Sequence, residues 1–389
     1  FMSDIKWPLM KDNLTLSDRV KMASFCLFSN RFTNGPKVRE FESEWNNWLG
    51  SKYSLYVSSG STANYLLLSS IKELYGLKNG DKVLVPADTW VTNIGPVIQL
   101  GFTPIFCDIN LQNFSFCEED LEYIAKKHPD IKLIFITHLI GYPANRDKYS
   151  ELFPNAILLD DVCESHGCKD SDNIKVGSDS LGSTFSFYFG HHISTIEGGM
   201  ISTNNYDLYD LMRIKRSHGL ARESERFEQY VDKYPQISKQ FMFVTDGYNF
   251  RNTELCAILG MSQLKRLDKY IEKRNVNYSK FISLIKKYSE KFVVPEYHDG
   301  ISNFCFPLLC KDKKTSHFLK KEFDENTIEH RPIIGGNLLR QPFLKNYNID
   351  TQKEKLNVDF VHDNGVYLGN NHFIGDKEIK MLEFILEKL

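Results

Sequence analysis

The chain has 389 residues, a mass of 45.2 kDa and a formal net charge of −2. Hydrophobic residues make up 42% of it and charged residues 25%, which excludes a disordered or fibrous protein and favours two packed globular lobes. Because the charge is nearly balanced and the chain has neither an apolar membrane span nor a signal-peptide pattern, we expect a cytoplasmic protein without nucleic-acid or membrane partners.

Strands and helices alternate in the first part of the chain. Apolar residues have helical spacing from Lys37 to Leu49, and Gly50 is typical of a helix end. Helix-length stretches also occur at Thr62–Tyr75 and Glu118–Lys127. Short apolar runs typical of strands lie at Tyr53–Val57, Lys82–Val85, Thr103–Phe106, Leu133–Thr137 and Ala156–Leu159. This order predicts an α/β protein with a mainly parallel sheet, whose ligands bind at the carboxyl ends of the strands.

The pattern changes near Glu254. A long helical pattern runs from Leu255 to Tyr288, and strand-like pieces follow at Phe292–Pro295 and Phe304–Leu309. We therefore predict two domains. Residues 1–253 form an N-terminal arm and a large α/β domain, and residues 254–389 form a linking helix and a smaller α+β domain.

Two motifs at strand ends are candidates for binding a phosphorylated cofactor. Residues 57–64 run from a strand through small residues into a helix, which suits a phosphate, although an ordinary capped helix has the same pattern. Residues 157–167 run from an apolar strand into acidic residues. Such an acid can hold the protonated pyridine nitrogen of a cofactor, with solvated loop acids or a metal site as the alternatives.

A third motif, residues 186–199, makes the pattern specific. Together the three segments resemble the sugar aminotransferases of the DegT/DnrJ/EryC1 family in order and spacing. Further matches lie at residues 34–36, 41–42, 86–90, 216–219 and 247–251. The resemblance covers most of the chain. It implies the aspartate-aminotransferase fold, which is fold type I of the enzymes that depend on pyridoxal phosphate (PLP).

His191 departs from the family pattern, in which a lysine usually forms an imine with PLP. Imidazole cannot form that imine, and no lysine lies between Lys175 and Lys215. The departure resembles the nucleotide-sugar 3-dehydratase subgroup, and the pattern is nearest to enzymes of colitose synthesis that act on GDP-4-keto-6-deoxy-D-mannose. This resemblance implies noncovalent PLP and pyridoxamine phosphate (PMP), and loss of the C3 hydroxyl from a nucleotide-linked 4-keto-6-deoxy sugar. L-glutamate would restore PMP.

Histidine suits this reaction because its ordinary pKa of about 6.5 lets it accept and return a proton near neutrality. We therefore take His191 as the catalytic residue. His192 beside it is the alternative base, but the register from Ser186 and from residues 197–199 favours His191.

The resemblance also implies how the cofactor phosphate is bound. Gly60 and Ser61 would offer backbone amides, and Ser186 would add its hydroxyl. Asn249 would reach the phosphate from the second subunit, so the protein would be a homodimer with shared active sites.

The cofactor ring has its own implied contacts. Trp90 would stack on the pyridine, with core packing as the alternative role. Asp161 would face the ring nitrogen. Glu164 would lie near the ring hydroxyl, where the family usually has glutamine.

Four residues are candidates for binding the nucleotide sugar. His218 and Arg222 lie in a segment that can reach the substrate or merely make loop contacts. Arg331 and Asn337 lie in a segment resembling one that closes over the substrate, and arginine and amide groups suit pyrophosphate and sugar hydroxyls. Either of these two can instead hold a turn.

Some related dehydrases carry an iron–sulfur cluster, which needs four cysteine ligands. Only Cys256, Cys305 and Cys310 follow His191 here, so we expect neither that cluster nor a metal. Two other functions stay open: a noncovalent aminotransferase and a catalytically silent sugar-binding homologue. The sequence does not choose guanine or cytosine as the base, hexose or heptose as the sugar, or dimer or tetramer as the assembly.

Overall fold

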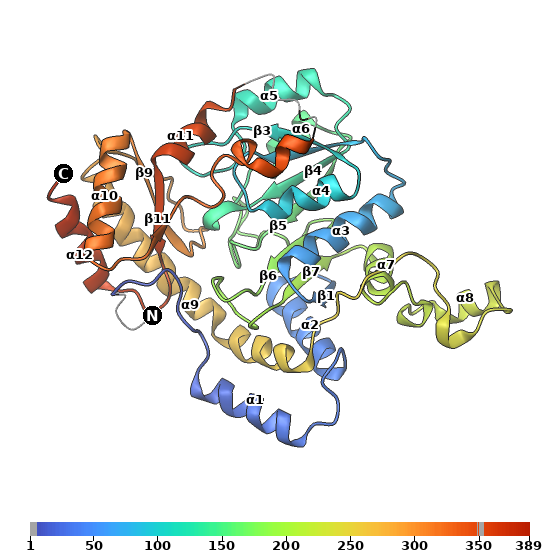
Figure 1. Cartoon of the computed structure of the whole chain (residues 1–389). Coiled ribbons are helices and arrows are strands. Elements are labelled where there is room, and N and C mark those ends of the chain that lie inside the picture. The colour runs from blue at the N-terminus through green and yellow to red at the C-terminus, as the bar shows by residue number, and fades with distance from the viewer. Residues whose placement is uncertain (1–5, 348, 350–353) are drawn as a thin grey trace.

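The computed structural model describes residues 6–347, 349 and 354–389, and its main feature is a seven-stranded sheet (Figure 1). The strand order is β1-β7-β6-β5-β4-β2-β3. Neighbours from β3 to β6 are parallel, whereas β7 is antiparallel to both β6 and β1. The strands are β1 (Tyr53–Val57), β2 (Lys82–Pro86), β3 (Thr103–Cys107), β4 (Leu133–Thr137), β5 (Ile157–Asp161), β6 (Ser183–Ser186) and β7 (Gly199–Thr203). The predicted mainly parallel sheet is confirmed, with β7 reversed.

Helices cover both faces of this sheet. Side chains alternate between the two faces, and apolar side chains on each face are buried against helices. Val83 and Val85 pack in the same cluster as α3 (Gly60–Leu74) and α7 (Tyr206–Arg216), whereas Leu84 packs in another. That second cluster includes residues of α5 (Glu118–Lys127) and α6 (Arg146–Leu152). Three more helices are α2 (Pro36–Leu49), α4 (Gly95–Gln99) and α8 (Phe227–Lys233). The result is the α/β/α arrangement that a largely buried parallel sheet requires.

A second sheet lies at the other end of the molecule (Figure 1). Its order is β10-β11-β9-β8, and all its pairs are antiparallel. Its strands and helices are β8 (Phe292–Val293), β9 (Cys305–Cys310), α10 (Lys313–Glu325), β10 (His330–Arg331), α11 (Leu356–Asn364), β11 (Gly365–Gly369) and α12 (Asp376–Leu386). The 33-residue α9 (Glu254–Lys286) leads from the large sheet to this one. Within the described part of the chain, no helix is long and apolar enough to cross a bilayer.

Trp7 and Leu9, which lie before α1 (Leu16–Phe28), pack on the small sheet, although they are far from it in the sequence. The buried Trp7 indole N–H donates to the carbonyl of Gly369 at 2.9 Å. The Leu9 N–H donates to the carboxylate of Glu329 at 3.0 Å. These two contacts hold the segment against the small sheet. The predicted domain boundary after residue 253 stays a prediction.

Candidate active site

A cavity of about 410 Å³ lies at the carboxyl ends of five strands of the large sheet. The residues that line it after these strands include Ser61 after β1, Trp90 after β2, Thr137 of β4, Asp161 of β5 and Ser186 of β6. Of the predicted site residues, the cavity brings together Gly60, Ser61, Trp90, Asp161, Glu164, Ser186, His191 and Arg331. This position agrees with the rule that ligands of open α/β sheets bind at the strand ends.

One end of the cavity is built to receive an anion. Ser59 caps α3 by accepting a hydrogen bond from the Thr62 N–H at 3.1 Å. Gly60 and Ser61, in the first turn, line the cavity. The N–H groups at this end of a helix have no partner within the helix and can bind an anion. A Cβ at Gly60 would lie 2.6 Å from the Cβ of Ser186, so only glycine allows β6 to approach this closely.

Asp161 supplies a fixed negative charge deeper in the cavity. It is buried at the end of β5, where one carboxylate oxygen accepts from the Asn64 side-chain amide at 2.8 Å. The other oxygen accepts from the Cys163 N–H at 2.9 Å. Asn64 is itself oriented by the Thr184 hydroxyl, which donates to it at 2.6 Å. A carboxylate held in this way suits a protonated ring nitrogen.

Asn64 is a positioning residue that was not predicted from the sequence. It is a fully buried polar residue on α3, between the core residues Ala63 and Leu66. A polar residue on the buried face of an amphipathic helix needs a hydrogen-bond partner. The position of Asn64 among apolar residues could therefore have indicated a role in the site.

His191 lies in the loop between β6 and β7 and lines the cavity. Its Nδ1 lies 3.2 Å from the carbonyl oxygen of Ser186. Because a carbonyl only accepts, Nδ1 carries the proton and Nε2 keeps its lone pair. Burial lowers the pKa of His191 to about 4, so its imidazole is neutral at pH 7. The side chain is therefore ready to act as a base.

His192 is held differently from His191. It is buried outside the cavity lining, and its Nε2–H donates to the carbonyl of Ser302 at 2.9 Å. The geometry thus favours His191 as the base.

Glu164 is a buried carboxyl in the cavity wall. Its Oε2 accepts from the Ile140 N–H at 3.1 Å. Ile140 has a φ of 55°, which is rare for a β-branched residue, and the next residue, Gly141, has a φ of 90°. This left-handed turn aims the Ile140 N–H at Glu164. Burial raises the pKa of Glu164 to about 8.

Aromatic and apolar side chains complete the walls. Trp90 is 57% exposed, so it does not serve as core packing and leaves much of its surface free for a ligand. Arg331 and Tyr367 line the side formed by the small sheet. Leu9 and Met10 enter from the N-terminal segment. These two were not predicted, because only the folded chain brings residues so distant in sequence together.

Two of the remaining predicted residues lie together outside this cavity. His218 and Asn249 are exposed, and Arg251 joins them through contacts of 3.4 Å with His218 Nε2 and 3.0 Å with Asn249 Oδ1. Arg222 is also exposed and donates to the carbonyl of Gln240 at 3.3 Å.

Asn337 also lies outside the cavity and is buried. Its side-chain amide donates to Asp359 at 2.8 Å, and its side-chain oxygen accepts from the Leu339 N–H at 2.9 Å. These contacts hold a turn near the cavity.

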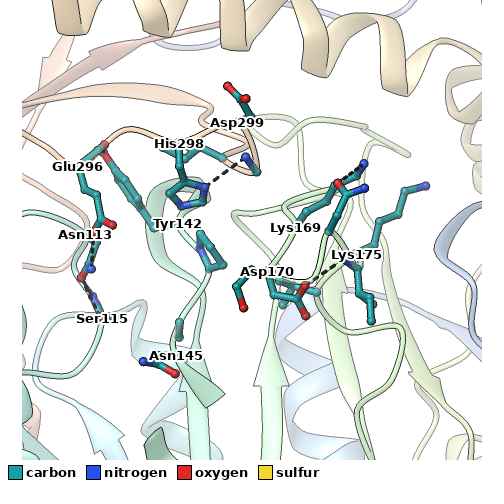
Figure 2. Close-up of a pocket in the computed structure, with 18 of the residues that line it drawn as sticks. Asn113, Ser115, Tyr142, Asn145, Lys169, Asp170, Lys175, Glu296, His298 and Asp299 are labelled. Carbon is teal, nitrogen blue, oxygen red and sulfur yellow. Dashed lines mark hydrogen bonds between the residues drawn. The ribbon is translucent and has the colours of Figure 1, made fainter. Parts of the chain in front are cut away.

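A second cavity, of about 1540 Å³, shares no lining residue with the first, and Figure 2 shows some of the side chains that line it. Its polar side chains largely bind one another: Asn113 donates to Glu296 at 2.8 Å and accepts from Ser115 at 2.7 Å, and Lys169 donates to Asn173 at 3.0 Å. None of the predicted site residues, all of which lie in the described chain, lines this cavity. We therefore assign the candidate active site to the smaller cavity.

The smaller cavity combines anion-binding amides, a buried carboxylate and a neutral imidazole. Its described lining contains no lysine. Pyridoxal or pyridoxamine phosphate fits this set of groups, because its phosphate is an anion and its ring nitrogen is a base. In this cavity the cofactor would be bound without a covalent bond to lysine.

The chain is similar to known proteins over most of its length. Residues 15–381 match the model of the DegT/DnrJ/EryC1/StrS aminotransferase family. A GDP-4-keto-6-deoxy-D-mannose 3-dehydratase of Yersinia pseudotuberculosis is 32% identical, with 92% of this chain and 93% of that protein covered. An enzyme of the same name from Escherichia coli O55:H7 is 33% identical, with 93% and 94% covered.

Solved structures give the same relationship. An E. coli GDP-4-keto-6-deoxy-D-mannose-3-dehydratase with bound hydrated PLP superposes with a TM-score of 0.89 at 30% identity, covering 98% of this chain and 99% of that one. The predicted fold of the PLP-dependent aminotransferases is thereby confirmed. The chain belongs to the DegT/DnrJ/EryC1/StrS aminotransferase family.

Proposed function

We propose that this protein is a PLP- and PMP-dependent lyase that removes the C3 hydroxyl from a nucleotide-linked 4-keto-6-deoxy sugar. The observation that carries the proposal is the neutral, oriented imidazole of His191 in a cavity whose described lining has no lysine. The two similar enzymes named above support GDP-4-keto-6-deoxy-D-mannose as the substrate and deoxysugar synthesis as the setting. A cytoplasmic location remains a prediction.

The residues of the cavity support a set of cofactor contacts. Gly60 and Ser61 would bind the phosphate through their N–H groups, together with the Ser186 hydroxyl. Trp90 would stack on the ring, and Asp161 would face its nitrogen. When bound, the amine form of the cofactor supplies a primary amine for the sugar ketone and a ring that withdraws electrons from the neighbouring carbon.

His191 moves the proton. As a general base, its Nε2 would accept a proton from the carbon that carries the amine of the cofactor, and as a general acid it would return that proton to the departing C3 hydroxyl. The Nδ1–H bond to the Ser186 carbonyl keeps the ring in one orientation during both steps. The negative charge of Asp161 favours the protonated form of His191, which exists after the first proton transfer and before the second.

The other predicted residues serve the substrate and the assembly. Arg331 lines the cavity and offers a guanidinium to the sugar or pyrophosphate. Asn337 supports the turn beside the cavity. His218 and Asn249, together with Arg222, lie on exposed surface. We propose that they complete the site of a second subunit in a homodimer.

L-glutamate is proposed as the amino donor that restores PMP. In support, a similar dehydratase structure, 30% identical, holds a PLP-glutamate geminal diamine. Arg331 would receive a carboxylate of glutamate in the cavity when the sugar is absent.

Mass spectrometry of the products tests the proposal. The protein is incubated with PLP, L-glutamate and GDP-4-keto-6-deoxy-D-mannose, and ammonia is measured in parallel. Loss of one oxygen from the sugar with release of ammonia is the expected result. An amino sugar would make the protein an aminotransferase. An unchanged sugar would contradict this substrate and favour a silent homologue or another nucleotide sugar.

A further inference from the structure

Glu164 is an acidic residue that lines the cavity, and the proposed reaction gives it no part in proton transfer. One of its oxygens, Oε2, is taken by the Ile140 N–H. The carboxyl is buried beneath the cavity surface and borders the space in which the cofactor ring is proposed to lie. Whether its second oxygen, Oε1, is protonated therefore decides whether Glu164 presents a hydrogen-bond donor or an acceptor to the ring.

The surroundings of Glu164 contain little positive charge. The titratable groups that influence the pKa of Glu164, or whose pKa it influences, are Asp88, Asp161, Cys163, Cys305 and Tyr367. Among the described residues, no ion pair includes Glu164. Arg331, which also lines the cavity, pairs instead with Glu329 at 3.7 Å.

Asp88 makes this cluster more acidic. It is fully buried next to the Trp90 loop, and burial and the nearby Glu164 raise the pKa of its carboxyl well above the ordinary value. Three buried carboxyls thus gather here, and Asp161 is the one held by side-chain and backbone donors. Buried like charges without a cation are costly, so protons remain on part of such a cluster.

We propose that Glu164 is a neutral carboxylic acid at pH 7 and that its Oε1–H donates a hydrogen bond into the cavity, to the ring oxygen of the bound cofactor. The Ile140 N–H supports this arrangement, because it donates to Oε2 and thereby favours Oε1 as the oxygen that carries the proton. An ionised Glu164 could only accept hydrogen bonds, so its carboxylate oxygen would face the ring oxygen of the cofactor without a proton between them. The inference rests on the proposed function, since the cofactor must occupy this cavity.

The sign of the pH effect follows from this state. The acid donates while it is protonated and loses the proton as the pH rises through about 8. Cofactor affinity should therefore be steady below that pH and fall by up to about tenfold per pH unit above it. Glu164→Gln keeps a donor of the same shape that does not titrate.

The first experiment measures dissociation constants of PMP and of PLP from about pH 6 to about pH 10. The ratio of the wild-type constant to that of Glu164→Gln should be constant up to about pH 8 and then rise. Glu151→Gln is the matched control, because Glu151 is exposed to solvent on α6 and lies outside the cavity lining, and this variant should follow the wild type. A ratio that stays flat to pH 10 would overturn the proposal.

A second experiment needs no cofactor. Infrared difference spectra of wild type minus Glu164→Gln at pH 7 should contain the carbonyl band of a carboxylic acid, and this band should disappear as the pH rises. Its absence at pH 7 would also overturn the proposal. If neither protein bound PLP or PMP, the proposed function would fail, while the infrared band would still report the protonation state of Glu164.

Discussion

His191 and His192 are adjacent in sequence but differ in their contacts. His191 Nδ1 is bound to the Ser186 carbonyl beside the cavity, whereas His192 Nε2 is bound to Ser302 outside its lining. His191→Asn should therefore reduce dehydration by about 10²-fold or more, since a general acid–base group typically contributes this much. His192→Asn is the matched control and should retain turnover within about tenfold. Steady-state kinetics would check this, and the reverse order would identify His192 as the base.

The pH profile gives a second residue-scale prediction. The pKa of His191 is lowered from its ordinary value to about 4, so the neutral base persists below the pH at which a free imidazole becomes charged. The acid limb of kcat/KM should lie between about pH 4 and about pH 6.5. A limb above pH 7 that is lost in His191→Asn would contradict the orientation and burial described for this side chain.

His191→Lys restores the residue type usual in the family. A lysine amine at this position can form a covalent link to PLP, so a new visible absorption band should appear while dehydration falls by about 10²-fold or more. His191→Gln is the control, because it removes the imidazole without adding an amine. Unchanged dehydration in the lysine variant would count against His191 as the base.

At the scale of elements, the first turn of α3 is where the cofactor phosphate is proposed to bind. Gly60→Ala places a Cβ 2.6 Å from the Cβ of Ser186, which forces α3 and β6 apart where the phosphate is proposed to bind. PLP and PMP affinity should fall about tenfold or more. Gly95→Ala, in α4, is the matched control, because its Cβ meets nothing within 4 Å. Equilibrium titration would compare them, and equal affinities would argue against the phosphate position.

The sequence predicted several elements well and missed others. The ranges of β1, β4 and α5 agree with the prediction, because their apolar residues follow a clear strand or helix period. β6 and β7 were not predicted as strands. β6 is short and polar, with Ser183 and Ser186 at its ends, and its burial comes from its neighbours in the sheet rather than from its own composition.

For the whole molecule, the proposed homodimer predicts complementation between two inactive variants. If Asn249 serves the partner's site, a dimer of one His191→Asn chain and one Asn249→Ala chain contains one intact site. Co-refolding the two variants in equal amounts should restore about a quarter of wild-type activity, because half of the dimers are mixed. Activity measured against each variant alone is the check. No recovery in dimers shown to be mixed would place both residues in one chain's site.

The sequence by itself determined the alternation of strands and helices, the motifs at strand ends and the replacement of the family lysine by His191, because these are local properties of the chain. The tertiary structure decided which of those residues share one cavity. It brought Leu9 and Met10 to the site, placed Asn64 against Asp161 and aimed the Ile140 N–H at Glu164. Such contacts join residues far apart in sequence, and they depend on the path of the whole chain rather than on any local period.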